Sequence, residues 1–150
     1  MADSRFSSIA PPSSTAPPLP PPRSGTPNRV LDVNLRGVFF CCQAAAGAMR
    51  RRGGHIVNVG DTAAAAARPN YIPYYLSKAG IESLTRGLAV ALRSRRIVVN
   101  CVAPGAVLRP AGFSAARWRR VTRGHAGSVA DVVAAVLFFA TCPPTSRARS

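Results

Sequence analysis

Residues 55–104 read HIVNVGDTAAAAARPNYIPYYLSKAGIESLTRGLAVALRSRRIVVNCVAP, and this stretch decides the fold. Short runs of β-branched residues at 55–59 and 97–102 predict two buried strands. Apolar residues at three- and four-residue spacing predict a helix between them, from about Tyr71 or Pro73 to Arg93. A strand, a helix and a second strand in this order form a βαβ unit. We therefore expect parallel strands joined by a right-handed crossover.

Tyr74 and Lys78 form a Tyr-x-x-x-Lys pair on the predicted helix, and Asp61 lies in the loop before it. Residues four apart on a helix share a face, so the phenol and the ammonium group can lie side by side. A neighbouring cation favours the phenolate. We therefore expect a lowered pKa that makes Tyr74 a proton donor or acceptor near neutral pH. The alternative is an edge tyrosine beside a solvated cation. Lys78 is the only lysine beside 19 arginines, which favours a specific need for a compact ammonium group.

The flanking sequence divides the chain into three parts. Residues 1–27 form a Pro/Ser-rich tract, which we expect to be disordered because it has few apolar side chains to offset its ordering entropy. Residues 28–141 form the predicted domain, and residues 142–150 a disordered tail. Within the domain, the pattern predicts a helix over 28–52 and a loop over 60–70 whose alanines can add a helical turn. It also predicts a loop over 105–127 and a helix capped by Ser128 and Asp131.

The formal net charge of +15, from 20 basic and 5 acidic residues, has to be weighed as a nucleic-acid signature. The arginines form small scattered clusters near predicted helix ends and in loops, where cations suit the helix dipole. No basic motif interleaved with aromatic residues is present, so we expect a solvated surface and no specific nucleic-acid partner. The 4 cysteines and 2 histidines lack the spacing of a metal site, and we expect reduced thiols and no metal.

No apolar stretch has the length of a transmembrane helix, and no signal-peptide core is present. We therefore expect no membrane association and a cytoplasmic location. The alternative is an organelle, because the N-terminal tract is rich in serine and poor in acidic residues, as transit peptides are.

Five landmarks along the chain together resemble the short-chain dehydrogenase/reductase family. They are Val33-Asn34-Leu35-x-Gly37, Ile56-Val57-Asn58, Tyr74-x-x-x-Lys78-Ala79-Gly80, Val99-Asn100-x-x-x-Pro104-Gly105 and Ser128-x-x-Asp131-Val132. Tyr-x-x-x-Lys alone is a weak pattern, whereas five landmarks in order at family-like spacing are a strong one. The resemblance covers about residues 30–140. It implies an α/β fold, a Rossmann-like doubly wound parallel sheet, and NAD(P)-dependent oxidoreductase activity on a small-molecule substrate.

The resemblance also implies a role for each matching residue. Tyr74 is the expected acid/base that exchanges a proton with a carbonyl or imine of the substrate. Lys78 is expected to bind the nicotinamide ribose and to lower the pKa of Tyr74. Asn34 is expected to hold a water that connects Lys78 to solvent. Pro104 and Gly105 are expected to contact the nicotinamide carboxamide, and Asn58 to connect neighbouring strands.

Asp61 departs from the family pattern. It precedes Tyr74 by 13 residues, at the position where most members carry serine. An ionised carboxylate accepts hydrogen bonds and donates none, so it suits an N–H-rich ring better than a developing alkoxide. The family's pterin reductases carry Asp at this position. A pterin-like nitrogen heterocycle is therefore the first expected substrate, with a simple carbonyl or alcohol as the alternative.

The family's N-terminal Gly-x-x-x-Gly-x-Gly turn, whose amides bind the cofactor phosphates, has no match here, and residues 142–145 read CPPT where the last strand is expected. We expect a partial domain, shortened at both ends, that lacks the nucleotide-binding strands and the last strand. Its unpaired strand edges favour self-association or pairing with a full-length reductase. NADP is the expected cofactor, with NAD as the alternative. Two functions stay open: a reductase that uses Tyr74, or an inactive interaction partner of a full-length reductase.

Overall fold

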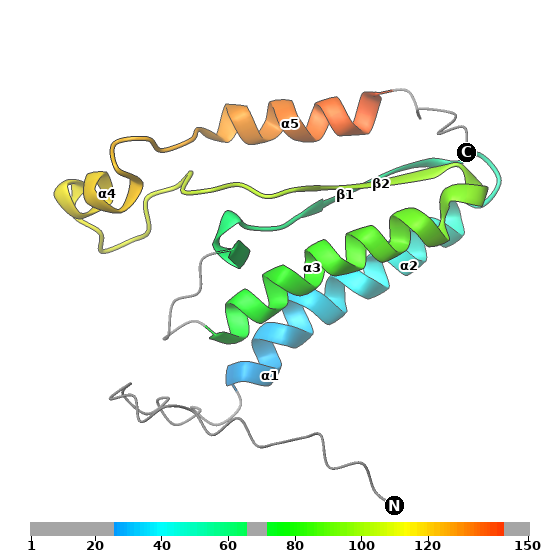
Figure 1. Ribbon diagram of the computed structural model, residues 1–150, viewed down its shortest axis with the longest axis horizontal. Coiled ribbons are helices and arrows are strands. Elements are labelled where there is room, and N and C mark those ends of the chain that lie inside the picture. Colours follow the sequence, from blue (N-terminus) through cyan, green and yellow to red (C-terminus); the bar gives the residue numbers. More distant parts are fainter. Residues whose placement is uncertain (1–25, 66–71, 143–150) are drawn as a thin grey trace, which may run out of the picture.

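The computed structural model describes residues 26–65 and 72–142, and it contains the predicted βαβ unit (Figure 1). Strands β1 (Gly54–Val59) and β2 (Ile97–Val102) are parallel and paired residue for residue along their length. Helix α3 (Ile72–Ala91) and the 3-10 turn η4 (Arg93–Arg95) connect them. The predicted strands, their parallel pairing and the intervening helix are therefore confirmed.

The helix before β1 is continuous but not uniform. It comprises α1 (Thr26–Leu31), a π-helical turn η1 (Asp32–Arg36) and α2 (Gly37–Ala48). The Gly37 amide donates to the Asp32 carbonyl, which closes the wide turn. The helix begins two residues inside the tract that we predicted to be disordered. It ends four residues before the predicted end at Arg52. The rest of the two predicted disordered segments, 1–25 and 143–150, lies outside the described residues.

Gly53 allows the chain to turn from this helix into β1. Its φ is +72°, in the left-handed region that favours glycine. A Cβ at this position would lie 2.5 Å from the carbonyl oxygen of Arg96, at the start of the neighbouring strand. Glycine is therefore required here by both the backbone conformation and the available space.

The expected loop over 105–127 contains a helix that the sequence analysis missed, α4 (Ala115–Thr122). Ser114 caps α4 by accepting a hydrogen bond from the amide of Arg117. The helix is only 8 residues long and buries no side chain, so it leaves no apolar periodicity in the sequence. Helix α5 (Val129–Thr141) follows Ser128 with a complete capping box to Asp131, which confirms that prediction.

The loop after β1 begins with the short 3-10 helix η2 (Thr62–Ala65), which is the helical turn expected among the alanines. Residues 66–71 lie outside the described residues. Where the chain is described, no helix is both long and apolar enough to cross a membrane.

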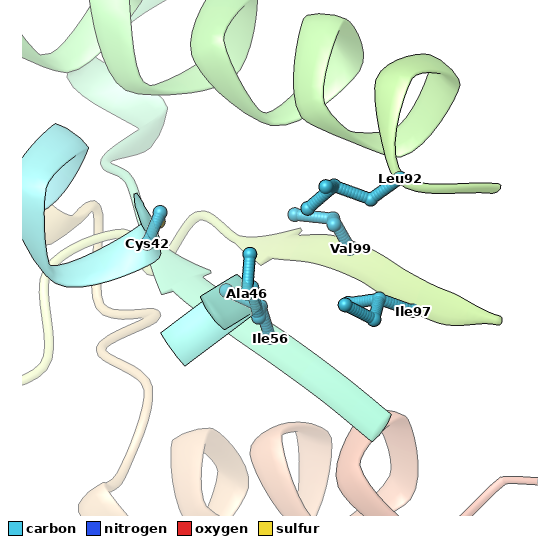
Figure 2. Close-up of a cluster of buried hydrophobic side chains, with 6 residues drawn as sticks. All are labelled: Cys42, Ala46, Ile56, Leu92, Ile97 and Val99. Atoms are coloured by element: carbon cyan, nitrogen blue, oxygen red, sulfur yellow. The ribbon is translucent and has the colours of Figure 1, made fainter. Parts of the chain in front are cut away.

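Helices α2 and α3 cover one face of the sheet, and α5 runs along the other (Figure 1). The main core lies between the strands and the first pair of helices. Figure 2 shows its buried members: Cys42, Ala46, Ile56, Leu92, Ile97 and Val99. By contrast, α5 buries none of its residues. In the part of the chain that the structure describes, the sheet has 2 strands, so each strand has one unpaired edge.

Candidate active site

The carboxyl ends of β1 and β2 remain paired beyond the sheet. The Gly60 amide donates to the Val102 carbonyl at 2.8 Å, and the Thr62 amide donates to the Pro104 carbonyl at 3.1 Å. Asp61 lies between these two bonds. Ligands of open parallel α/β sheets bind outside the carboxyl ends of the strands, so this edge is the first place to look for a site.

Tyr74 reaches this edge from the first turn of α3. Its hydroxyl donates a hydrogen bond to Oδ2 of Asp61, and its ring is half-buried. The pKa of Tyr74 is raised to about 12, first by burial and then by the hydrogen bond to Asp61 and the negative charge of Asp61. The expectation of a lowered pKa was therefore wrong. Tyr74 is a neutral phenol whose proton is bound to a carboxylate.

Lys78 lies one helical turn after Tyr74, as its spacing predicted. Its Nζ donates to the carbonyl of Val59 at 3.3 Å, and it lies 5.8 Å from the centroid of the Tyr74 ring. The ammonium group therefore contacts the ring face and the end of β1, and its bonding partner is not the Tyr74 hydroxyl. This placement is the physical reason that Asp61, and not Lys78, is the neighbour that adds to the effect of burial on the Tyr74 pKa.

Asn34 lies in the π-helical turn and faces the same helix. Its Nδ2 donates to Oγ of Ser77 at 3.3 Å, and Ser77 in turn donates to the carbonyl of Tyr74 at 2.6 Å. Ser77 is fully buried, so this pair fixes η1 against the first turn of α3. The sequence analysis did not single out Ser77, although its place between Tyr74 and Lys78 was the available signal. The water-holding role of Asn34 stays a prediction.

Pro104 and Gly105 lie at the same edge, directly after β2. The hydroxyl of Thr62 donates to the Pro104 carbonyl at 3.5 Å, and a Cβ at Gly105 would lie 3.4 Å from that hydroxyl oxygen. The structure therefore brings Asp61, Tyr74 and Lys78 to the edge of the sheet at which Pro104 and Gly105 also lie. Thr62, which the sequence analysis missed, connects the two strand ends.

Asn58 connects different elements from those expected. Its Nδ2 donates to the hydroxyl of Thr85 on α3 at 2.9 Å, and the thiol of Cys42 on α2 donates to its Oδ1 at 3.3 Å. Burial raises the pKa of Cys42, so the thiol is a neutral donor. The prediction that Asn58 ties neighbouring strands together was wrong. It ties β1 to the two helices that cover it.

The residues at this edge fit the nicotinamide and ribose end of a dinucleotide. Lys78 has further N–H donors beside the one bound to Val59, and a phenol both donates and accepts, so together they suit the hydroxyl groups of a sugar. Gly105, which is exposed, lies at the same edge of the sheet as Lys78 and Tyr74. The sequence has no match to the glycine turn that binds the cofactor phosphates. The residues described here therefore fit the nicotinamide and ribose end of the cofactor and not its phosphate end. Across the described residues, no three His, Cys, Asp or Glu side chains group closely enough to bind a metal ion.

Comparison with known proteins gives a consistent result. A family model described as enoyl-(acyl carrier protein) reductase matches residues 24–142. A short-chain type dehydrogenase/reductase from Picea abies is 37% identical over 122 residues, which cover 76% of this chain and 45% of that protein. Carbonyl reductase family member 4 from Danio rerio is 39% identical over 117 residues, covering 76% of this chain and 49% of its own.

Among solved structures, gluconate 5-dehydrogenase from Burkholderia cenocepacia, in complex with NADP and tartrate, superimposes with a TM-score of 0.70 at 30% identity. The match covers 76% of this chain and 48% of that one. The fold is thus a partial Rossmann-like α/β fold of the oxidoreductase class. The chain belongs to the short-chain dehydrogenase/reductase family. It spans about half the length of the curated relatives that it matches.

Proposed function

We propose that this chain performs the proton-transfer part of an NAD(P)-dependent reduction, with Tyr74 as the acid/base. The observation that carries the proposal is the Tyr74 hydroxyl at the carboxyl edge of the sheet, bound to Asp61 and with Lys78 over its ring. A phenol with a pKa of about 12 is protonated at neutral pH, so it acts as a proton donor to a substrate oxygen or nitrogen. A nicotinamide cofactor, when bound, supplies the hydride. NADP is our first choice, because the gluconate 5-dehydrogenase structure holds NADP, and NAD is the alternative.

The hydrogen bond between Tyr74 and Asp61 restricts the substrate. A substrate that takes the Tyr74 proton must first replace this bond. A pterin-like ring does so without loss, because one ring N–H donates to Asp61 while a neighbouring nitrogen or oxygen accepts from Tyr74. A simple carbonyl accepts from Tyr74 but leaves Asp61 facing a developing negative charge. We therefore propose a pterin-like substrate, with the carbonyl class suggested by the name of the Danio rerio relative as the alternative.

The test is NADPH binding to the whole chain, measured by fluorescence titration, followed by turnover with a dihydropterin and with a carbonyl substrate. Tyr74→Phe should lower kcat by about 100-fold or more, because the proton donor is lost. Tyr75→Phe is the matched control, since its ring is a neighbour in the same helical turn, and this variant should keep the rate. Equal rates for both variants, or no NADPH binding, would contradict the proposal.

A second candidate function, a non-catalytic partner of a reductase, is favoured by a separate feature. An apolar groove of about 760 Å³ lies between the N-terminal helix and α3. Its lining comprises Leu31, Asp32, Leu35, Arg36, Phe39, Leu76, Ala79, Gly80, Ser83 and Leu84. Phe39 and Leu76 are exposed large hydrophobic residues in this groove. Exposed apolar surface of this kind is typical of protein interfaces, so we propose a second copy or a full-length reductase as the occupant.

Leu76→Glu tests this candidate, with Val90→Glu as its control. Both residues are exposed on α3, but Val90 does not line the groove. Light scattering should show an oligomer for the parent and for Val90→Glu, and a smaller species for Leu76→Glu. A parent that is monomeric and that co-purifies with no full-length reductase would refute the interaction function while leaving the catalytic one standing.

A further inference from the structure

Two arginine-rich turns meet where the strands begin, at the edge of the sheet opposite to the candidate active site. Residues 50–52, after α2, are three arginines, and residues 93–96, after α3, read Arg-Ser-Arg-Arg. Figure 1 shows α2 and α3 ending at this edge, at the far end of the molecule from α4. The turns are bonded to each other: the amide of Gly54 donates to the carbonyl of Arg96 at 3.1 Å, and Nη2 of Arg96 donates to the carbonyl of Arg51 at 3.3 Å. Two distant segments therefore bring together one set of arginines, the amino-edge cluster: Arg50, Arg51, Arg52, Arg93, Arg95 and Arg96.

The amino-edge cluster is exposed, and no acidic group balances its charge. All of its members are exposed residues. The sequence contains no acidic residue between Asp32 and Asp61, or between Glu82 and Asp131. Within the described residues, none of these arginines takes part in a salt bridge, and Arg96 is the one whose side chain donates a hydrogen bond. The other guanidinium groups of the cluster are therefore available to an external anion.

Helix dipoles account for only a small part of this charge. Arginines commonly follow helices, because a helix C-terminus carries the equivalent of about half a negative charge. The ends of α2 and α3 together therefore offset about one positive charge of the cluster. The remaining charge is concentrated on one edge of the molecule, which is typical of a surface that binds a polyanion.

The residues around the cluster favour the phosphate backbone of a nucleic-acid duplex. The guanidinium fork of arginine binds two phosphate oxygens at once. Single strands are bound by aromatic side chains that stack on the bases, but the sequence has no Phe, Trp or Tyr between Phe40 and Tyr71. There is also none between Tyr75 and Phe113. Membrane surfaces are bound by large apolar side chains beside the basic ones, and the exposed large hydrophobic residue closest to the cluster in sequence is a single valine, Val90.

We propose that the amino-edge cluster binds the phosphate backbone of a nucleic-acid duplex without sequence preference. Phosphate contacts carry no sequence information, so the proposal agrees with the absence of a basic motif interleaved with aromatic residues. The surface is separate from Tyr74 and Lys78, because it lies at the opposite edge of the sheet. Binding there is therefore measurable whether or not the chain acts as a reductase.

The test is fluorescence anisotropy of a labelled DNA duplex of random sequence and about 20 base pairs, titrated with the full chain at salt concentrations from about 50 to 200 mM. The triple variant Arg51→Gln/Arg52→Gln/Arg95→Gln removes charge from both turns but keeps Arg96 and its bond to the carbonyl at position 51. The slope of log affinity against log salt should fall by about one for each lost phosphate contact, so by about three in this variant. The affinity at about 50 mM salt should fall at least about tenfold.

Arg117→Gln/Arg119→Gln/Arg120→Gln is the matched control, because it removes the same charge from exposed residues of α4. Its salt slope should change by less than about one. Equal weakening by both triple variants overturns the proposal in favour of general charge attraction. The single variants Arg52→Gln and Arg119→Gln repeat the comparison, so the test does not depend on the folding of a triple variant, which circular dichroism checks.

Two further titrations test the class of polyanion. A single strand of the same length replaces the duplex in the first, and it should bind more weakly at equal salt; tighter binding of the single strand would overturn the assignment to a duplex. Vesicles of phosphatidylcholine and phosphatidylserine replace it in the second. Vesicle binding that needs the three substituted arginines of the cluster, together with duplex binding that does not, would make the partner a membrane surface and the proposal wrong.

Discussion

Replacing Asp61 with serine should lower the pKa of the Tyr74 hydroxyl, because serine removes the carboxylate that accepts the Tyr74 proton. Burial is the largest cause of the raised pKa, and the substitution does not remove it. The hydrogen bond to Asp61 and the charge of Asp61 are the next causes, and both are lost. We therefore expect the pKa to fall below about 12 but to stay above its ordinary value of 10.

The same shift affects stability at high pH. The folded-state pKa of Tyr74 lies above its ordinary value of 10, so the neutral phenol stabilises the fold fully below about pH 10. This contribution disappears as the pH rises through about 12. Two pKa units correspond to about 2.7 kcal/mol, and solvent screening around the half-buried ring reduces this to roughly 1 kcal/mol. The Asp61→Ser variant should lose part of this pH-dependent contribution to stability, because burial, the largest cause, remains.

The assay is a spectrophotometric titration of the tyrosinate band, in which Tyr74→Phe provides the difference spectrum against the other two tyrosines. Circular dichroism at each pH checks that the chain remains folded. Asp61→Asn is the informative control, because its amide oxygen keeps an acceptor for Tyr74 while the charge is lost, and its pKa should lie between those of the parent and Asp61→Ser. A parent Tyr74 that titrates at or below 10 would refute the reasoning and restore Lys78 as the dominant neighbour.

Three further substitutions test the packing that positions the site. Gly53→Ala should cost at least about 2 kcal/mol in a urea unfolding curve, because it places a Cβ in the left-handed region and against the carbonyl of Arg96. Asn58→Ala should cost about 2 to 3 kcal/mol, since it breaks buried hydrogen bonds to both covering helices; a loss below 1 kcal/mol by thermal unfolding would argue against a structural role. Ser128→Ala should cost about 1 kcal/mol by removing the cap of α5, whereas Ser128→Thr, which keeps the hydroxyl, should retain most of the stability.

The parts of the fold that the sequence predicted are those with long, regular patterns. Two β-branched runs and a 20-residue apolar periodicity determined β1, β2 and α3, because each buries a face against the others. Helix α4 escaped prediction because it buries none of its residues, and its one clear sequence signal is the capping residue Ser114. The π-helical turn also left no trace, since its wide hydrogen bond to Gly37 does not change the apolar spacing around it.

For the site, sequence spacing predicted which residues meet but not how they bond. The spacing of four placed Lys78 beside Tyr74, yet the ammonium group binds the carbonyl of Val59 and lies over the ring. Burial raises the Tyr74 pKa, and whether a neighbour adds to or opposes that shift depends on which neighbour reaches the hydroxyl. That is decided by the loop after β1, which carries Asp61 13 residues earlier in the chain. No helical periodicity encodes a contact across such a loop.

Breaking the hydrogen bond between Tyr74 and Asp61 costs free energy of binding, and this cost differs between the two substrate classes. A hydrogen bond to a charged group contributes about 1.5 to 3 kcal/mol, and a ligand that breaks it without a replacement loses that amount. At 1.4 kcal/mol per tenfold, a simple carbonyl binds about 10- to 100-fold more weakly than a ring whose N–H satisfies Asp61. Comparing the binding of both substrate classes to the parent and to Asp61→Ser therefore tests this reasoning: the preference for the ring should shrink in the variant, and an unchanged preference would show that Asp61 does not select the substrate.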